Sequence, residues 1–62
     1  MKFKEGDVVK LKSGGHKMVI VESLNTEYPL YVCYWFNVYK QVEKFKFEEF
    51  LLMKVNKVII KK

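Results

Sequence analysis

The segment that decides the fold has the sequence Gly6-Asp7-Val8-Val9-Lys10-Leu11-Lys12-Ser13-Gly14-Gly15-His16-Lys17-Met18-Val19-Ile20. Apolar side chains alternate with lysines in its first half, so Val9 and Leu11 share one face of an expected strand over 8–12. Residues 13–16 are typical of a turn, because two adjacent glycines can adopt positive φ. A second β-rich run, 17–22, follows directly. The two runs predict a β-hairpin.

Further short strands are expected along the chain. Residues 30–36 are all β-branched, aromatic or otherwise apolar, which is typical of a strand that is apolar on both faces. Pro29 precedes this run, and proline does not continue a central strand. In 41–47, Phe45 and Phe47 alternate with lysines, which predicts a fourth strand with its rings directed inward.

The C-terminal part predicts one helical turn and one or two further strands. Residues 48–51 break the alternation and begin with two carboxylates, which suits one turn of 3₁₀ helix. Leu51, Met53 and Val55 then alternate along an expected fifth strand. Residues 58–60 either form a sixth strand or extend the fifth. The alternative is that the segment 57–62 is a frayed tail.

Together these elements predict one all-β domain over residues 1–62: a small, partly open barrel of five or six strands, with one short 3₁₀ turn before the last main strand. A chain of 62 residues allows a single domain with a thin core. Five Phe, four Tyr and one Trp can still build that core. Because no run approaches the roughly 20 apolar residues of a membrane helix, and the N-terminus lacks a signal-peptide pattern, we expect a cytoplasmic protein that does not engage membranes.

The quoted segment resembles the small bacterial YodC-like proteins, an uncharacterised family whose hallmark runs roughly G-D-x-V-x-L-x-S-G-G-P-x-M-x-V, with a second hallmark C-x-W-F. The matching residues are Gly6, Asp7, Ser13, Gly14, Gly15, Met18, Cys33, Trp35 and Phe36. His16 stands where that family usually has proline. The resemblance extends to about Val55 and implies an SH3-like barrel in which these residues are structural. It implies no activity.

Few residues could carry catalysis or hold a metal. Cys33 is the only cysteine and His16 the only histidine, which excludes an internal disulfide and leaves a zinc site short of ligands. A histidine can activate a thiol, but Cys33 lies in the middle of a strand between large rings and is expected to be a buried hydrophobe. The Ser-Gly-Gly turn lacks the helix and Lys-Ser/Thr of a phosphate loop. We therefore expect no enzyme, no cofactor and no metal.

The first functional hypothesis is a binding module for a protein partner or for a second copy of itself. The strand over 30–36 has more aromatic surface than so small a core covers, and exposed aromatic patches mark interfaces. The contrary interpretation is that both faces are buried, one of them by the C-terminal tail. The expected contact surface combines this strand with the turn Ser13–Lys17; its candidate residues are Tyr31, Tyr34, Trp35, Tyr39 and His16.

A second hypothesis, from another class, is nucleic-acid binding. The net charge is +5, carried by lysines without any arginine. Outward lysines could follow a phosphate backbone; the candidates are Lys10, Lys12, Lys17, Lys44 and Lys46. The missing arginines count against base recognition, and outward lysines also serve solubility. A third alternative is a small anionic ligand bound at a subunit interface, as in an inhibitor or sequestering protein of a bacterium or phage.

Overall fold

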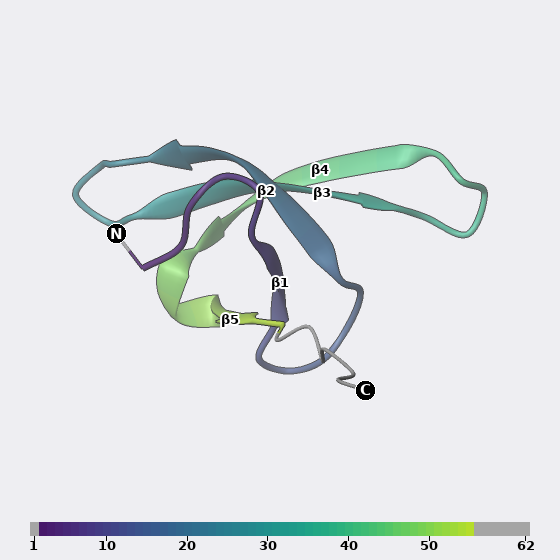
Figure 1. Ribbon diagram of the computed structural model, residues 1–62, viewed down its shortest axis with the longest axis horizontal. Helices are drawn as coiled ribbons and strands as arrows, with labels where there is room; N and C mark the ends of the chain where they lie inside the picture. Colours follow the sequence, from purple (N-terminus) through teal and green to yellow (C-terminus); the bar gives the residue numbers. More distant parts are fainter. Residues whose placement is uncertain (1, 56–62) are drawn as a thin grey trace, which may run out of the picture.

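The computed structural model describes residues 2–55 of the chain. It contains strands β1 (Val8–Leu11), β2 (Met18–Leu24), β3 (Leu30–Phe36), β4 (Val42–Glu48) and β5 (Leu52–Lys54), with the 3₁₀ turn η1 (Glu49–Leu51) before β5 (Figure 1). The predicted all-β class, the five main strands and the single 3₁₀ turn are confirmed. The strand predicted for 58–60 lies outside the described residues. Within residues 2–55, no helix has the length and apolar character needed to cross a membrane.

All five strands belong to one antiparallel sheet of order β4-β3-β2-β1-β5. The first four strands follow one another as neighbours, and β5 returns to the outer edge of β1. The two outermost strands, β4 and β5, do not pair, so the sheet is curled but not closed (Figure 1). The partly open architecture predicted from the sequence is therefore confirmed.

The β1–β2 turn depends on its two glycines. Gly14 and Gly15 have φ angles of 107° and 115°, a region that side chains with a Cβ rarely enter. The N–H of Gly14 donates to the carbonyl of Leu11 at 2.9 Å. The two strands pair antiparallel, with Val8 opposite Val19 and Val9 opposite Met18, which confirms the hairpin predicted for residues 8–22.

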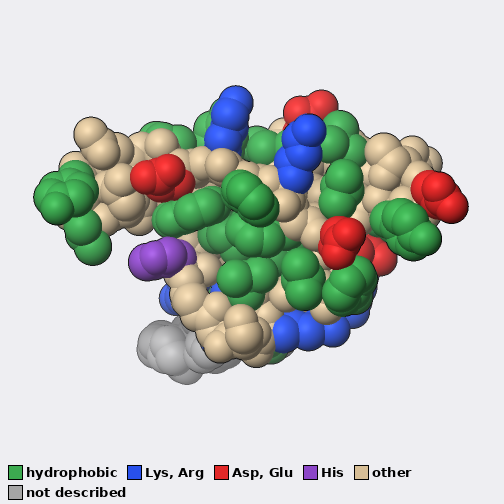
Figure 2. All heavy atoms as spheres, turned by 180° about the vertical axis from the view of Figure 1, so that it is seen from behind, with side chains coloured by type: hydrophobic (Ala, Val, Ile, Leu, Met, Phe, Trp, Pro, Cys, Tyr) green, Lys and Arg blue, Asp and Glu red, His purple; other side chains and the backbone are tan. Residues whose placement is uncertain are grey.

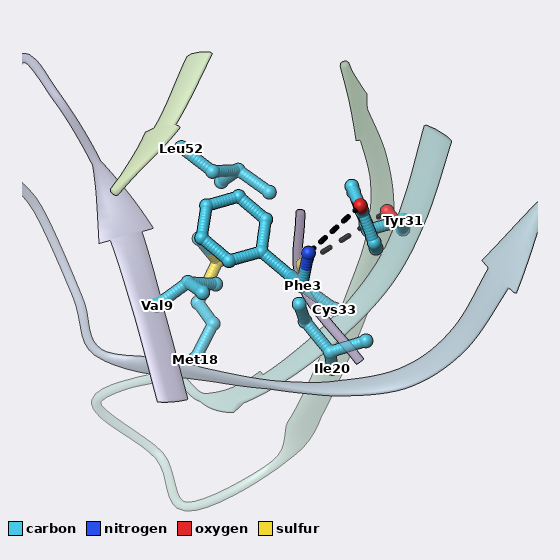
Figure 3. Packing of buried hydrophobic residues seen from close by; sticks show 7 residues of the cluster. All are labelled: Phe3, Val9, Met18, Ile20, Tyr31, Cys33 and Leu52. Atoms are coloured by element: carbon cyan, nitrogen blue, oxygen red, sulfur yellow. Dashed lines mark hydrogen bonds between the residues drawn. The ribbon is translucent and has the colours of Figure 1, made fainter. Parts of the chain in front are cut away.

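The core lies on the concave side of the curled sheet. Every strand except β4 contributes to it, and Phe3 of the N-terminal segment packs into its centre (Figure 3). The Phe3 ring meets the Tyr31 ring edge-on, with centroids 5.4 Å apart. The fully or nearly fully buried residues are Phe3, Val9, Met18, Ile20, Tyr31, Cys33 and Leu52.

One detail of the predicted core is wrong. Phe45 was expected to point inward, but it is 62% exposed. It shares the face of its partner Cys33, yet β4 is an edge strand and the core does not extend beneath it there. In β5, the buried residue is Leu52, whereas Leu51 and Met53 are 40% and 42% exposed. The predicted fifth strand therefore begins one residue later than Leu51, which belongs to η1.

Candidate functional site

Four rings form a continuous line beside the core, which we call the aromatic row: His16, Trp35, Phe47 and Phe45. The His16 and Trp35 rings are nearly parallel, at 12°, with centroids 6.4 Å apart. Trp35 and Phe47 follow at 6.2 Å, and Phe47 and Phe45 at 5.2 Å, both tilted. These separations lie in the range in which aromatic pairs attract one another.

The sheet register brings three of these rings together. On β4, Phe45 lies opposite Cys33, and Phe47 lies opposite Tyr31. Because side chains on a strand alternate between faces, Trp35 shares the face of these residues. His16 joins the row from the β1–β2 turn, which is distant from β3 in sequence. The row is therefore assembled by the tertiary fold.

The aromatic row extends from the margin of the core into solvent. Trp35 and Phe47 are half-buried and pack against the core cluster, whereas Phe45 is 62% exposed. Figure 2 shows the face that carries the histidine: hydrophobic side chains gather in its middle, and charged side chains lie mostly around them. This arrangement leaves an uncovered apolar area among residues 2–55.

The structure brings together part of the predicted contact surface. His16 and Trp35 do meet, as expected for a surface joining the Ser13–Lys17 turn to β3. Tyr31 is wrong as a surface residue, because its side chain is fully buried. Tyr34 projects from the opposite face of β3, since its position alternates with that of Trp35. Tyr39 is 78% exposed in the β3–β4 turn, outside the row.

Sequence reasoning missed Phe45 as a surface residue and did not place Phe47 in the aromatic row, although Phe47 does point inward and packs against the core cluster. Phe45 and Phe47 were interpreted as core rings, because alternation with lysines indicates only that they share a face. The order of strands in the sheet decides how much of that face is covered. The signal that could have identified them is the position of 41–47 as the last strand of a meander, which makes it an edge.

The β3–β4 turn is held by one side chain, Asn37. Its Oδ1 accepts hydrogen bonds from the N–H groups of Tyr39 and Gln41 at 2.8 and 3.0 Å. Its Nδ2 donates to Glu43 Oε2 at 2.8 Å, and Glu43 lies opposite Trp35. Lys40 adopts a φ of 65° in the same turn. These bonds fix the end of the hairpin that carries three rings of the aromatic row, those of Trp35, Phe45 and Phe47.

The candidate lysines are spread over the convex face rather than gathered at one point. Lys17 borders an apolar groove of about 410 Å³. Lys44 and Lys46 border a second groove of about 450 Å³, where Glu22 lies with them. Lys44 Nζ is 5.9 Å from the centre of the Tyr34 ring, a cation–π distance. The first groove is lined by Val8, Lys17, Met18, Val19, Tyr34, Trp35, Phe36 and Val42.

The remaining two lysines lie in and after β1, at the other side of the sheet. Lys10 pairs with Met53 of β5, and the backbone N–H of Lys12 donates to the carbonyl of Leu51 at 2.9 Å. In the sheet order, β2 and β3 separate β1 from β4. The five lysines therefore do not form one cluster.

A hydrogen-bond cluster that runs from the buried Tyr31 out to the surface ties the N-terminal segment to η1. Tyr31 Oη donates to Glu49 Oε2 at 2.6 Å and accepts from the N–H of Phe3 at 3.1 Å. The N–H of Lys2 donates to the same Glu49 oxygen at 2.8 Å. Burial, and then the bond to Glu49, raise the pKa of Tyr31; the bond from Tyr31 lowers the pKa of Glu49. The cluster positions Phe3 over the core.

Cys33 is fully buried, and burial raises the pKa of its thiol to about 11. A protonated thiol without solvent access is a poor nucleophile. Within residues 2–55, no group of three or more His, Cys, Asp or Glu side chains is placed to hold a metal ion.

The motif residues at the start of the chain hold the backbone. Gly6, at φ 94°, donates its N–H to the carbonyl of Ile20 at 2.8 Å. Asp7 Oδ2 accepts from the N–H of Lys4 at 3.1 Å, and the Asp7 carbonyl accepts from the N–H of Ile20 at 2.9 Å. Ser13 lies exposed before the turn glycines. Phe36, by contrast, is 64% exposed and is no part of the core.

Comparison with known proteins identifies a family but no activity. A family model described as an uncharacterized small protein (DUF2158) matches residues 4–50, which include the first four strands and the residues of the aromatic row. Neither a curated protein nor a solved structure matches the chain. The match does not carry the YodC name, so that part of the resemblance stays a prediction. The chain belongs to the family of uncharacterized small proteins that this model describes.

Proposed function

We propose that this protein is a non-catalytic binding module that contacts another protein through the aromatic row. The observation that carries the proposal is the unbroken line of rings from His16 to Phe45, half-buried at one end and exposed at the other. Aromatic residues are enriched in protein interfaces, where they supply most of the binding energy.

The aromatic row is also preorganised in the free protein. Trp35 and Phe47 are held against the core, and the β3–β4 hairpin that carries Phe45 is fixed at its turn by Asn37. Binding by a preorganised surface loses less conformational entropy than binding by a mobile loop. A rigid aromatic surface therefore suits a stable contact with a folded partner.

The non-catalytic part of the proposal is supported by the burial of the Cys33 thiol and by the packing of the His16 ring. The Cys33 thiol is buried, with its pKa raised to about 11, which opposes thiolate formation. The His16 ring lies nearly parallel to the Trp35 ring, with centroids 6.4 Å apart, which is a packing role. We extend the proposal to an SH3-like barrel, in line with the meander of four strands and the return of β5 to β1.

Crosslinking from the row tests the contact. We would place the photoreactive residue p-benzoylphenylalanine at position 45 and, as a matched control, at position 28, where Tyr28 is 66% exposed in the β2–β3 turn. Irradiation in the producing cells should give protein adducts from position 45 and not from position 28. Adducts of nucleic acid alone, or equal adducts from both positions, would contradict the proposal.

The protein found in an adduct is then identified by mass spectrometry, purified, and titrated with the unmodified chain. Phe45→Ser should weaken its binding at least tenfold, because it removes the exposed ring. Phe45→Leu, which keeps an apolar side chain, should retain more of the affinity. Equal affinity of wild type and Phe45→Ser would show that the row does not carry the contact.

The polyanion hypothesis receives less support. Lys44 and Lys46 share their groove with Glu22, and β2 and β3 separate them from Lys10 and Lys12 on the far side. A phosphate backbone binds best to an uninterrupted positive surface. Binding of a small anionic ligand is also weakly supported, because the groove beside Lys17 is mostly apolar and offers an anion few polar partners.

A further inference from the structure

We propose that the partner is a second copy of this chain, and that the two copies join through their β4 strands. In this dimer, the strands pair antiparallel about a two-fold axis at Lys46, with Lys44 opposite Glu48 of the second copy and Phe45 opposite Phe47 of the second copy. The inference rests on the proposed function, a protein contact through the aromatic row, and names the occupant of that contact.

The outer edge of β4 is available for such pairing. β4 ends the sheet, and among residues 2–55 no segment pairs with its outer side (Figure 1). Its seven residues, from Val42 to Glu48, pair with β3 without any register shift. A long, regular edge strand is a template for another strand.

The hydrogen bonds at both ends of the hairpin show which backbone groups face outward. Asn37 N–H donates to the Gln41 carbonyl at 2.9 Å, and Glu49 N–H donates to the Pro29 carbonyl at 3.1 Å. Hydrogen-bonded pairs alternate along an antiparallel ladder. The odd-numbered residues of β4 therefore bond to β3, and the N–H and C=O groups of four residues point outward: Val42, Lys44, Lys46 and Glu48.

Charge and the length of the overlap together select one register among those that join the outward-facing groups. With the axis at Lys46, Lys44 lies opposite Glu48 of the second copy, and by symmetry this pair occurs twice. With the axis at Phe45, Lys44 would lie opposite Lys46 twice. With the axis at Lys44, no Glu of β4 would lie opposite a Lys of β4. With the axis at Phe47, Lys46 would lie opposite Glu48 twice, but only residues 46–48 of β4 would overlap, whereas the axis at Lys46 overlaps residues 44–48. Opposite charges directly across a sheet stabilise it, and like charges destabilise it.

The charge balance of β4 also favours contact at this strand. The chain carries a net charge of +5, but β4 contains two lysines and two glutamates, so its formal charge is zero. Lysines on an edge commonly prevent pairing. Here the glutamates offset them, and among pairs of β4 residues in the selected register only Lys46 meets a like charge.

The same register joins the two aromatic rows. The odd-numbered residues then form the non-hydrogen-bonded pairs, in which the strands approach most closely. Phe45 lies opposite Phe47 of the second copy on the core-facing side, and this pair also occurs twice. The 62% exposed Phe45 ring becomes covered, and aromatic pairs across a sheet add to its stability.

Charge-swap variants test the dimer and its register. Sedimentation velocity over a wide concentration range would compare wild type with Lys44→Glu, Glu48→Lys and the double variant. Each single variant should raise the dimer dissociation constant about tenfold or more, since two attractive pairs become repulsive. The double variant should restore dimerisation, because the pairs are attractive again. A stronger dimer for Lys44→Glu would indicate the axis at Phe45 and overturn the register.

A backbone variant tests the edge itself. Lys46→Pro removes an outward N–H that β4 does not use within the chain, and proline is accepted at such edge positions. It should give a folded monomer, with unchanged circular dichroism. Lys46→Thr, which keeps the N–H, should remain dimeric. A dimer of Lys46→Pro as tight as wild type would overturn the pairing.

The proposed function can fail or survive independently. A wild-type chain that stays monomeric at all concentrations overturns the second-copy inference, while adducts from position 45 to a different protein would still support the contact through the row. Absence of adducts from position 45, together with a dimer that is insensitive to all these variants, would overturn both.

Discussion

Removing one hydroxyl group, in Tyr31→Phe, should destabilise the fold measurably. Tyr31 Oη accepts the N–H of Phe3 and donates to Glu49. In the variant, the buried Phe3 N–H loses its partner, which costs about 1–3 kcal/mol. A chain of this size has a total stability of only about 3–9 kcal/mol. The loss should lower the midpoint of urea unfolding by about 1 M.

Fluorescence of Trp35, the single tryptophan, follows this unfolding. Tyr28→Phe is the matched control, because Tyr28 is 66% exposed. The control should change the stability by no more than about 0.5 kcal/mol. Equal midpoints for Tyr31→Phe and Tyr28→Phe would refute the role given to the Tyr31 hydroxyl in holding the N-terminal segment.

The pH dependence gives a second readout of the same bond. The hydrogen bond from Tyr31 is the largest cause of the lowered pKa of Glu49, followed by the bond from the N–H of Lys2. A carboxyl group whose pKa is lowered by folding stabilises the fold above its unfolded pKa, about 4.3 for Glu, and loses that contribution as the pH falls through the folded value. The wild-type chain should therefore lose stability below about pH 4.3, and Tyr31→Phe should lose less. Identical pH slopes would contradict the coupling.

Three further outcomes follow from burial and backbone geometry. Leu52→Ala should cost about 2–5 kcal/mol in urea unfolding, and Met53→Ala, at a 42% exposed neighbour, much less; equal losses would show that the buried face of β5 is misassigned. The Cys33 thiol, with its pKa at about 11 and no solvent exposure, should react with an aromatic disulfide at pH 8 only after urea is added, so rapid reaction of the folded chain would contradict its burial. Lys40→Gly relieves a φ of 65° and should raise the free energy of unfolding by at most about 1 kcal/mol, seen as a slightly higher melting temperature. A clearly lower melting temperature would argue against that turn geometry.

Local patterns predicted the elements of this fold well. The alternation and the glycines of residues 6–20 predicted the first hairpin, because turn chemistry and side-chain period act over a few residues. The run 30–36 predicted β3 with the bounds that the structure shows. Residues 48–51 predicted η1 to within one residue. Each of these features depends on neighbours in the sequence.

Burial was harder to predict, because it depends on the place of a strand in the sheet. Tyr31 and Trp35 share one face of β3, yet Tyr31 is fully buried and Trp35 only half-buried. A run that is apolar on both faces has no alternation to show which face covers the core. Phe45 has the pattern of a core residue and is exposed only because β4 is an edge strand. The aromatic row thus required the tertiary arrangement.

The part of the candidate site that the sequence did predict is the meeting of turn and strand. The turn at 13–16 and the strand at 30–36 were expected to form one surface, and His16 does stack on Trp35. The predicted lysine surface required the fold to place the first and fourth strands next to each other, which their sequences alone do not determine. The sheet order places those lysines toward opposite sides of the sheet instead.

The most direct test of contact through the aromatic row is a dilution series followed by ¹H–¹³C spectra of the aromatic rings and ¹H–¹⁵N spectra of the backbone. We expect the ring signals of Trp35, Phe45 and Phe47 to shift together with the amide signals of Lys44 and Lys46 as the chains associate. Shifts confined to the groove on the convex face, at residues such as Val8 and Val19, or no shifts at any concentration, would contradict self-association through the row.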